Sequence, residues 1–172
     1  MVILISGKQR AGKDTTAKML SNFWEGAEII HFADKLKDLA RELFDMQGKD
    51  RQLLIDLGSK MRSIDPDVWV RYALKKMEAE PDKIWIVPDW RFKNEEEYIK
   101  NNSNQEILTI RVHASSDIRK SRGASYYEAA EEDPSEKDLD SHGFDYVFRN
   151  EDTLEDLYTL VVGLAILEGW VR

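Results

Sequence analysis

The turn ISGKQRAGKDTTA, at residues 5–17, constrains the chain more strongly than any other feature of its sequence. It follows an apolar run at residues 2–6 and precedes a helical pattern, and two glycines and a lysine within it fit the spacing G-x-x-x-x-G-K. Glycine lets the backbone wrap so closely that several N–H groups point at one anion, and the positive end of the following helix points at the same place. The turn therefore predicts a phosphate-binding loop between a strand and a helix.

Lys13 is expected to place a compact positive charge on the β- and γ-phosphates of a bound nucleotide. The next position of the Walker A pattern is normally Ser or Thr, but here it is Asp14. Two interpretations stay open: either Asp14 binds Mg²⁺ directly or through water, or Asp14 only favours the helix N-terminus while Thr15 holds the metal. The loop residues expected to bind ATP are Gly7, Lys8, Arg10, Ala11, Gly12, Lys13, Asp14, Thr15 and Thr16.

Short apolar runs alternate with helical patterns along the rest of the chain, which is typical of a parallel sheet covered by helices. Asp152 and Glu155 have the spacing of a capping box and predict the start of the last helix. The fold class is therefore α/β, with a central, mostly parallel five-stranded sheet flanked by helices, in a single domain over residues 1–172. The expected strands are residues 2–6, 29–32, 84–88, 107–112 and 146–148.

The formal net charge of −8 argues against a nucleic-acid partner, which needs a broad basic face. No apolar run approaches membrane-spanning length, and the N-terminal MVILIS lacks the basic residues that begin a signal peptide. The absence of cysteine excludes disulfides and thiolate metal sites and fits a reducing compartment. We therefore expect a cytoplasmic protein that handles anionic ligands in a small, locally basic site, and the sequence leaves homodimer formation open.

Residues 115–143 form a long polar segment that contains the acidic run EAAEEDPSEKDLD near its end. It is either a lid over the site or a surface insertion, and both interpretations stay open. Arg119 and Arg122 lie one helical turn apart in this segment, so both would project on the same side. In a lid they would stabilise transition-state charge and exclude water, whereas otherwise they form a solvated basic helix face.

Five stretches together resemble a known family. LISGKQRAGKDTTA, HFADKLKDLARELF, LGSKMRSIDPDVWV, VPDWRFKNEEEYI and DYVFRNEDTLEDL occur in the order and spacing of the phage deoxynucleoside monophosphate kinases, which have the P-loop kinase fold. The resemblance spans nearly the whole chain and implies transfer of the ATP γ-phosphoryl group to a deoxynucleoside monophosphate, with Mg²⁺, in the cytoplasm of a phage's host. The GKD variant of the loop also occurs in the phosphomevalonate kinases of animals.

Asp89 and Arg91 end the apolar strand at residues 84–88, at the sheet edge where open α/β folds bind ligands. Asp89 would hold Mg²⁺ through water or orient Arg91, and Arg91 would present its planar guanidinium to a phosphate of the substrate. The alternative is a structural ion pair between the two side chains at a strand end.

The remaining candidates lie where an acceptor and the adenine would enter. Asp34 and Lys37 follow the second strand and either contact the acceptor or lie on a solvated helix face. By resemblance, Arg62 would grip the acceptor phosphate and Trp69 would line the base pocket, although a tryptophan also fits a core position. Analogy with related folds puts Asn150 near the adenine of ATP.

The expected chemistry needs no strong general base, because the acceptor phosphate is already an anionic nucleophile near neutral pH. Catalysis then consists of alignment and charge neutralisation, and the catalytic residues would be Lys13, Arg91, Arg119 and Arg122. Two alternatives stay open: a P-loop kinase for another small acceptor, such as a phosphomevalonate-like compound, and a non-catalytic nucleotide-binding switch. The absence of an N-K-x-D base-reading motif counts against the switch.

Overall fold

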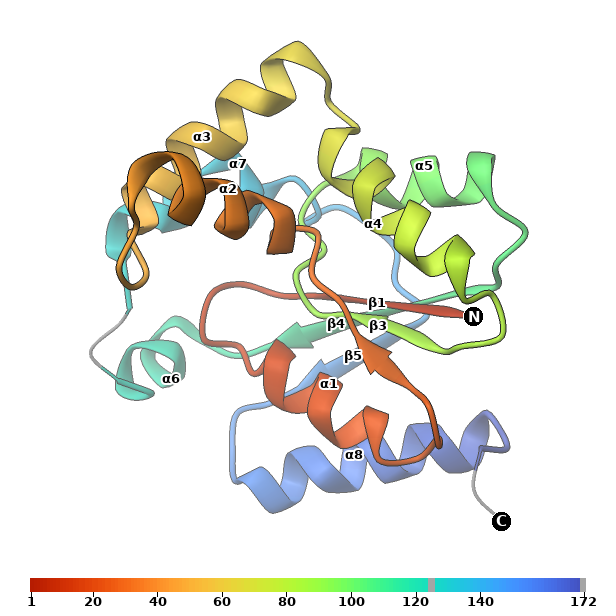
Figure 1. The fold of residues 1–172 in the computed structure, drawn as a ribbon. Coiled ribbons are helices and arrows are strands. Elements are labelled where there is room, and N and C mark those ends of the chain that lie inside the picture. The colour runs from red at the N-terminus through yellow and green to blue at the C-terminus, as the bar shows by residue number, and fades with distance from the viewer. Residues whose placement is uncertain (124–125, 171–172) are drawn as a thin grey trace.

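The computed structural model describes residues 1–123 and 126–170 and is built around a five-stranded sheet with the strand order β2-β3-β1-β4-β5 (Figure 1). All four strand pairings are parallel, so the carboxyl ends of the strands lie at the same edge. The α/β class and the five-stranded sheet predicted from the sequence are confirmed. The strands are β1 (Val2–Ser6), β2 (Glu28–Ile29), β3 (Trp85–Val87), β4 (Ile107–His113) and β5 (Tyr146–Arg149).

Helices cover both faces of the sheet (Figure 1). On one face lie α1 (Lys13–Ser21) and α8 (Leu154–Leu167). The opposite face is covered by α2 (Asp34–Phe44), α3 (Arg51–Ile64), α4 (Val68–Ala79) and α5 (Lys93–Asn102). The segment from 115 to 143 holds three short elements: α6 (Ser116–Ser121), a 3₁₀ helix η1 (Glu128–Glu132) and α7 (Pro134–Lys137).

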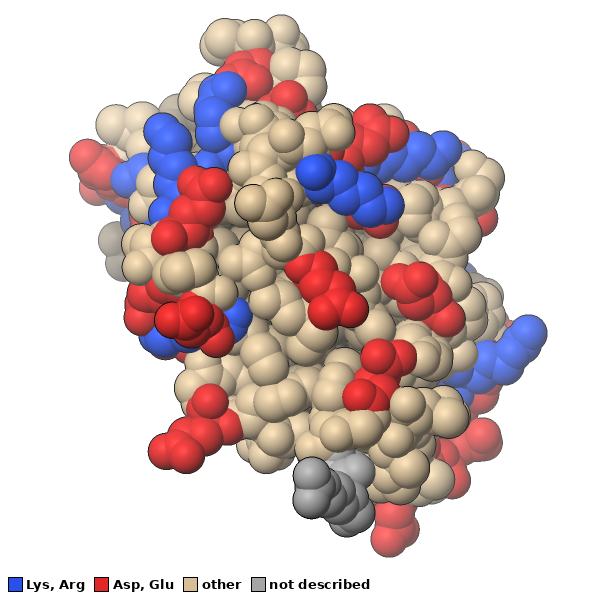
Figure 2. Space-filling view, turned by 90° about the vertical axis from the view of Figure 1, so that its right-hand side faces the viewer, with Lys and Arg blue, Asp and Glu red and all other residues tan. Residues whose placement is uncertain are grey.

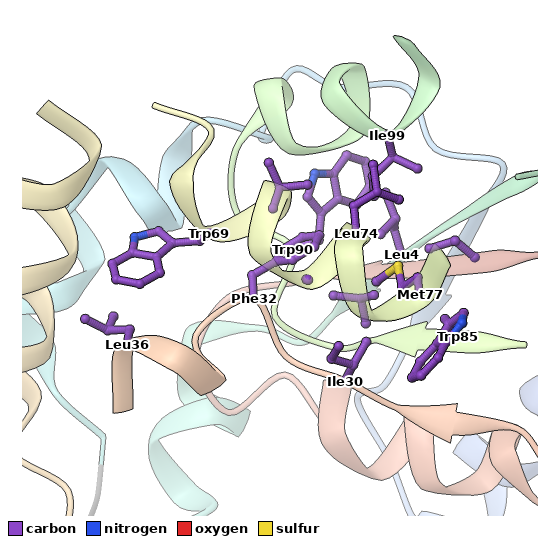
Figure 3. Packing of buried hydrophobic residues seen from close by; sticks show 14 of the residues in the cluster. Leu4, Ile30, Phe32, Leu36, Trp69, Leu74, Met77, Trp85, Trp90 and Ile99 are labelled. Carbon is purple, nitrogen blue, oxygen red and sulfur yellow. The ribbon is translucent and has the colours of Figure 1, made fainter. Parts of the chain in front are cut away.

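Strand β1 is buried along its whole length because both faces of the sheet are covered. Alternate residues point to opposite faces, so Leu4 packs under α4 and α5 while Ile3 and Ile5 pack against α1 and α8. Figure 3 shows the first of these two cores, in which Trp90 and Met77 are fully enclosed. This central strand leads directly into the glycine turn and fixes where that turn begins.

Several predicted boundaries differ from those in the structure, and two of the differences have a local cause. The second strand ends at Ile29 rather than at residue 32, because the backbone N–H of Phe32 donates to the Asp89 carboxylate instead of a neighbouring strand. The last helix is capped by Thr153 and Asp156, one residue beyond the predicted pair. The Thr153 hydroxyl accepts from the Asp156 N–H, and the Asp156 carboxylate accepts from the Thr153 N–H, which completes the capping box.

The face at the amino ends of the strands carries scattered Asp and Glu side chains across its middle, with Lys and Arg nearer its upper margins (Figure 2). No basic surface extends over this side, which lies opposite the glycine turn. Among the residues that the structure describes, no helix is both long and apolar enough to cross a membrane.

Candidate active site

The glycine turn adopts backbone conformations that require its glycines. Gly7 and Gly12 have φ values of 153° and 109°. A Cβ atom on Gly7 would lie 2.3 Å from the carbonyl oxygen of Val112, and one on Gly12 would lie 2.3 Å from Nδ2 of Asn150. The chain can therefore make this tight passage between β1, β4 and β5 only without side chains at these two positions.

Lys13 begins α1, and its side chain folds back across the turn. Its Nζ donates to the carbonyl oxygen of Lys8 at 2.9 Å, which ties the two ends of the loop together. Burial, and then the nearby Arg91 guanidinium, lower the pKa of Lys13 to about 7. Since a bound anion favours the charged form of a lysine, a phosphate here would restore the full positive charge.

A cavity of about 610 Å³ opens at the carboxyl edge of the sheet, between the glycine turn, α2, α3, the start of α4 and α7. This volume is within the usual range of small-molecule sites. Several residues predicted for the site share its wall: Arg10, Gly12, Lys13, Asp14, Thr15, Lys37, Arg62, Trp69, Asp89, Arg91 and Arg122. The other predicted residues are not among those that line it: Gly7, Lys8, Ala11, Thr16, Asp34, Arg119 and Asn150.

The three side chains predicted to bind the metal, Asp14, Thr15 and Asp89, all line the cavity. Nε2 of His31 lies 3.4 Å from the Asp14 carboxylate, an interaction that lowers the pKa of Asp14 and raises that of His31. Both oxygens of Asp89 accept backbone N–H groups, from Phe32 and Ala33 at 2.9 and 3.0 Å. Asp89 therefore holds the chain after β2 in place beside the loop.

These oxygens fit Mg²⁺, which usually takes one or two protein oxygens and completes its shell with water and substrate phosphates. Asp14 and Thr15 share the cavity wall with Lys13, and the carboxylate of Asp14 is kept ionised. No group of three or more acidic, histidine or cysteine side chains with metal-site geometry exists within residues 1–123 and 126–170. The donor set is thus suited to a metal that arrives with a nucleotide rather than to a metal held by the protein alone.

Lys37 and Asp34 form an ion pair across one turn of α2, with Nζ and Oδ1 3.2 Å apart. Asp34 also accepts the backbone N–H of His31 at 2.9 Å, so its carboxylate holds the turn that precedes the helix. Lys37 lines the cavity, whereas Asp34 is not among the lining residues. Of this predicted pair, only the lysine is positioned to meet a ligand.

Cationic and aromatic side chains gather at the far end of the cavity, beyond Asp89. The guanidinium carbon of Arg62 lies 4.6 Å from the centre of the Phe92 ring, the geometry of a cation–π contact. Lys49 and Arg51 line the cavity nearer the glycine turn, where an Arg51 N–H donates to the Gln9 side-chain oxygen at 3.1 Å and Lys49 lies close enough to Asp14 for their charges to interact. Trp69 also lines the cavity but is 4% exposed and packs in the core shown in Figure 3, so it is a core residue that borders the cavity, and its contact with a base stays a prediction.

The two arginines of the 115–143 segment both contact the glycine turn but differ in their other partners. Arg122 lines the cavity and donates to the carbonyl oxygens of Arg10, Ala11 and Asn150. Arg119 is buried outside the cavity, where the Glu131 carboxylate accepts two of its N–H groups at 2.6 and 2.8 Å. Arg119 also donates to the carbonyl oxygen of Gln9 at 3.3 Å, so both arginines reach the backbone of the glycine turn, although only Arg122 lines the cavity.

Asn150 holds the backbone of the glycine turn in place through hydrogen bonds. Its Nδ2 donates to the carbonyl oxygen of Ala11 at 2.8 Å, and its own carbonyl and side-chain oxygens accept from Arg122. The side chain is almost fully buried. Asn150 therefore contacts the loop backbone, and its place near the adenine of ATP stays a prediction.

Gln9 and Glu136 were missed by the sequence analysis. The Gln9 side chain contacts Arg51 at the start of α3, and both the Tyr127 backbone and Glu131 in the 115–143 segment. Glu136 accepts the backbone N–H of Gln9 at 2.8 Å and an Arg91 N–H at 2.7 Å. Only the acidic composition of its segment pointed to that region, and it did not single out one carboxylate.

Comparison with known proteins adds the family. A family model described as phosphomevalonate kinase matches residues 5–105. A phosphomevalonate kinase of Drosophila melanogaster is 27% identical over 170 residues, covering 90% of this chain and 90% of its own.

Solved structures show the same fold at low sequence identity. A sugar kinase from Janibacter sp. HTCC2649 has a TM-score of 0.63 at 15% identity and covers 99% of this chain and 98% of its own. An APS kinase of Mycobacterium tuberculosis, in complex with AMPPNP and APS, has a TM-score of 0.57 at 12% identity, with 96% of both chains covered. A shikimate kinase of Aquifex aeolicus has a TM-score of 0.54 at 14% identity, covering 98% of this chain and 97% of its own.

These similarities confirm the P-loop kinase part of the resemblance found in the sequence. They do not support its finer part, a phage enzyme of deoxynucleotide metabolism, and the named relative matches the alternative acceptor considered there.

Proposed function

Because the chain belongs to the phosphomevalonate kinase family, we propose that it transfers the γ-phosphoryl group of ATP to the phosphate of a small phosphomonoester, with phosphomevalonate as the first candidate acceptor. The observation that carries the proposal is the charge layout of one cavity. Lys13 and the glycine turn stand at one end together with Lys49 and Arg51, and Arg62 lies near the opposite end of α3 from Arg51. A site with cations at both ends suits two phosphorylated ligands better than one phosphorylated ligand and one neutral alcohol.

The residues of the chain would act by positioning and by charge. The acceptor phosphate supplies its own nucleophilic oxygen, so no side chain needs to remove a proton from it. Lys13 and Arg91 lie close enough for their charges to interact, and together they would stabilise the negative charge on the transferred group. Arg62 would fix the acceptor phosphate for in-line attack.

Asp14 and Thr15 are the residues that would hold Mg²⁺. The metal, when bound with the nucleotide, neutralises charge on the phosphates. The chain's own contribution is to keep Asp14 ionised through its contact with His31.

A nucleoside monophosphate is the second candidate acceptor, and one observation favours it. The rings of Trp69 and Phe92 border the acceptor end, and an aromatic wall suits a planar base that stacks or packs edge-on. Phosphomevalonate has no ring to occupy such a wall. The two candidates share the phosphate contact and differ in what Trp69 and Phe92 would meet.

The test is an acceptor panel followed by ADP release with Mg·ATP. The panel holds phosphomevalonate, ribo- and deoxyribonucleoside monophosphates, and shikimate and gluconate as acceptors that lack a phosphate. We expect ADP formation to depend on a phosphomonoester. Slow ADP formation that no acceptor accelerates would instead indicate a nucleotide-binding switch and would contradict the proposal.

A variant pair tests the role of the loop lysine in the same assay. Lys13→Ala should lower turnover by orders of magnitude, because the positive charge beside the phosphates is lost. The circular dichroism spectrum should stay native, because alanine keeps the helix. Lys18→Ala is the matched control, since Lys18 is an exposed lysine on the same helix. Full turnover in a folded Lys13→Ala protein would refute the role given to Lys13.

A further inference from the structure

Glu136 is a buried carboxylate on the wall of the nucleotide cavity. It lies in α7, and its side chain is 6% exposed. One oxygen accepts the backbone N–H of Gln9, inside the glycine turn, and the other accepts an N–H of Arg91. Glu136, Gln9 and Arg91 all line the cavity that also holds Lys13.

These donors are the kind that bind phosphate oxygens. A backbone N–H of the glycine turn and a guanidinium N–H favour any anionic oxygen, and a carboxylate offers such oxygens as a phosphate does. The negative charge of Glu136 is also close enough to act on Lys13. Glu136 therefore holds a position that, on the proposed function, belongs to a substrate phosphate.

We propose that Glu136 is an internal anion that holds α7 against the glycine turn, as a latch, and that a nucleotide phosphate must displace it. The inference rests on the proposed function, because it assumes that ATP binds at this turn. A buried carboxylate and a triphosphate repel each other at short range, so they cannot share Gln9 and Arg91. Opening of this latch thus precedes or accompanies nucleotide binding.

The rest of the segment is held by contacts that a phosphate would not disturb. Glu131 pairs with Arg119 outside the cavity, and Asp138 accepts the backbone N–H of Lys93 at 2.8 Å. Asp140 pairs with Arg111 at 2.6 Å. Release of Glu136 therefore frees one short helix while its flanks stay anchored, which limits the movement to α7.

The latch predicts an affinity cost that a substitution removes. If the open form makes up about a tenth of the empty protein, the apparent dissociation constant for nucleotide is about tenfold above the intrinsic value. Glu136→Gln keeps the size of the side chain but removes its charge. The amide has one acceptor oxygen, so its NH₂ group must face either the Gln9 N–H or the Arg91 guanidinium, and that hydrogen bond is lost. We expect this variant to bind nucleotide about tenfold more tightly than the natural protein.

The experiment is calorimetric titration with a non-hydrolysable ATP analogue and MgCl₂, without acceptor. Glu132→Gln is the matched control, because Glu132 is a lid carboxylate that pairs with Lys137 on the surface and is 83% exposed. Tighter binding by Glu136→Gln alone supports the latch. Equal or weaker binding by Glu136→Gln overturns it and makes Glu136 a support of the loop.

Two further measurements keep the outcome interpretable. If Glu136→Gln does not fold, Glu136→Asp serves in its place, since a side chain shorter by one methylene cannot reach both donors and should also bind more tightly; equal or weaker binding by Glu136→Asp overturns the latch as well. If neither the natural protein nor any variant binds the analogue, the proposed function itself fails, and the latch fails with it. Equal binding by all three proteins leaves the kinase proposal standing and removes only the latch.

Discussion

Glu95 makes the stability of this protein depend on pH in a direction opposite to that of most carboxylates. It lies in the first turn of α5, is 5% exposed, and accepts the backbone N–H groups of Arg91 and Phe92 at 2.8 and 3.0 Å. Burial raises its pKa to about 8, against the effect of these two hydrogen bonds. A protonated carboxyl still accepts both hydrogen bonds, so the neutral form suits the folded state.

The magnitude follows from the distance between the folded and unfolded pKa values. Below pH 4.5 the carboxyl is protonated in both states, and the folded protein has its full stability. As the pH rises from 4.5 to about 8, only the unfolded state releases the proton, and folding loses about 1.4 kcal/mol per pH unit. Between pH 5 and pH 9 the free energy of unfolding should fall by roughly 4 kcal/mol on account of this one group.

Glu95→Gln should abolish this slope, because the amide keeps an acceptor oxygen and never ionises. The assay is urea unfolding followed by circular dichroism at pH 5, 7 and 9, with the natural protein, Glu95→Gln and Glu97→Gln. The last variant removes an exposed carboxylate from the same helix. We expect the free energy of unfolding of Glu95→Gln to increase relative to that of the natural protein as the pH rises. Parallel pH profiles for the natural protein and Glu95→Gln would refute the argument, and an equal change in Glu97→Gln would assign the slope elsewhere.

Three further substitutions test the site and the core. Gly7→Ala should destabilise the protein by at least ~1–3 kcal/mol in urea unfolding, because the new Cβ meets the Val112 carbonyl at a positive φ; unchanged stability would contradict the turn geometry. Arg62→Lys should raise the acceptor KM about tenfold and leave the ATP KM unchanged, since the planar fork above Phe92 is lost; an equal rise in both KM values would place Arg62 elsewhere. Trp90→Ala should cost about 3–5 kcal/mol, because the indole is fully enclosed, and a loss below 1 kcal/mol would show that the core collapses around it.

The nucleotide end of the site was predictable because its signal is local. An apolar run followed by glycines at fixed spacing specifies β1, the turn and α1 within twenty-one residues, and the structure reproduces them at the same positions. The cap of α8 was missed by one residue for a related reason. Asp152 and Glu155 have the same spacing as Thr153 and Asp156, and only the folded backbone decides between them.

The inward-facing carboxylates of the 115–143 segment were not predictable, because their partners are distant in sequence. Nothing within the acidic run distinguishes Glu136, which turns inward, from Glu132, which stays in water. The partners of Glu136 are Gln9 and Arg91, more than forty residues away. Arg119 shows the same limit, since its helical spacing with Arg122 says nothing of the Glu131 side chain that captures it.

The contacts of Gln9 bear on how the protein could be re-engineered for a new acceptor. The side-chain amide of Gln9 joins the glycine turn to Arg51, the first residue of α3, and to the backbone of Tyr127. An α3 taken from another kinase would therefore also change the contacts of the glycine turn and of the 115–143 segment. On the proposed function, a change of acceptor made through α3 would also affect nucleotide binding, so libraries that vary α3 should let residue 9 vary with it.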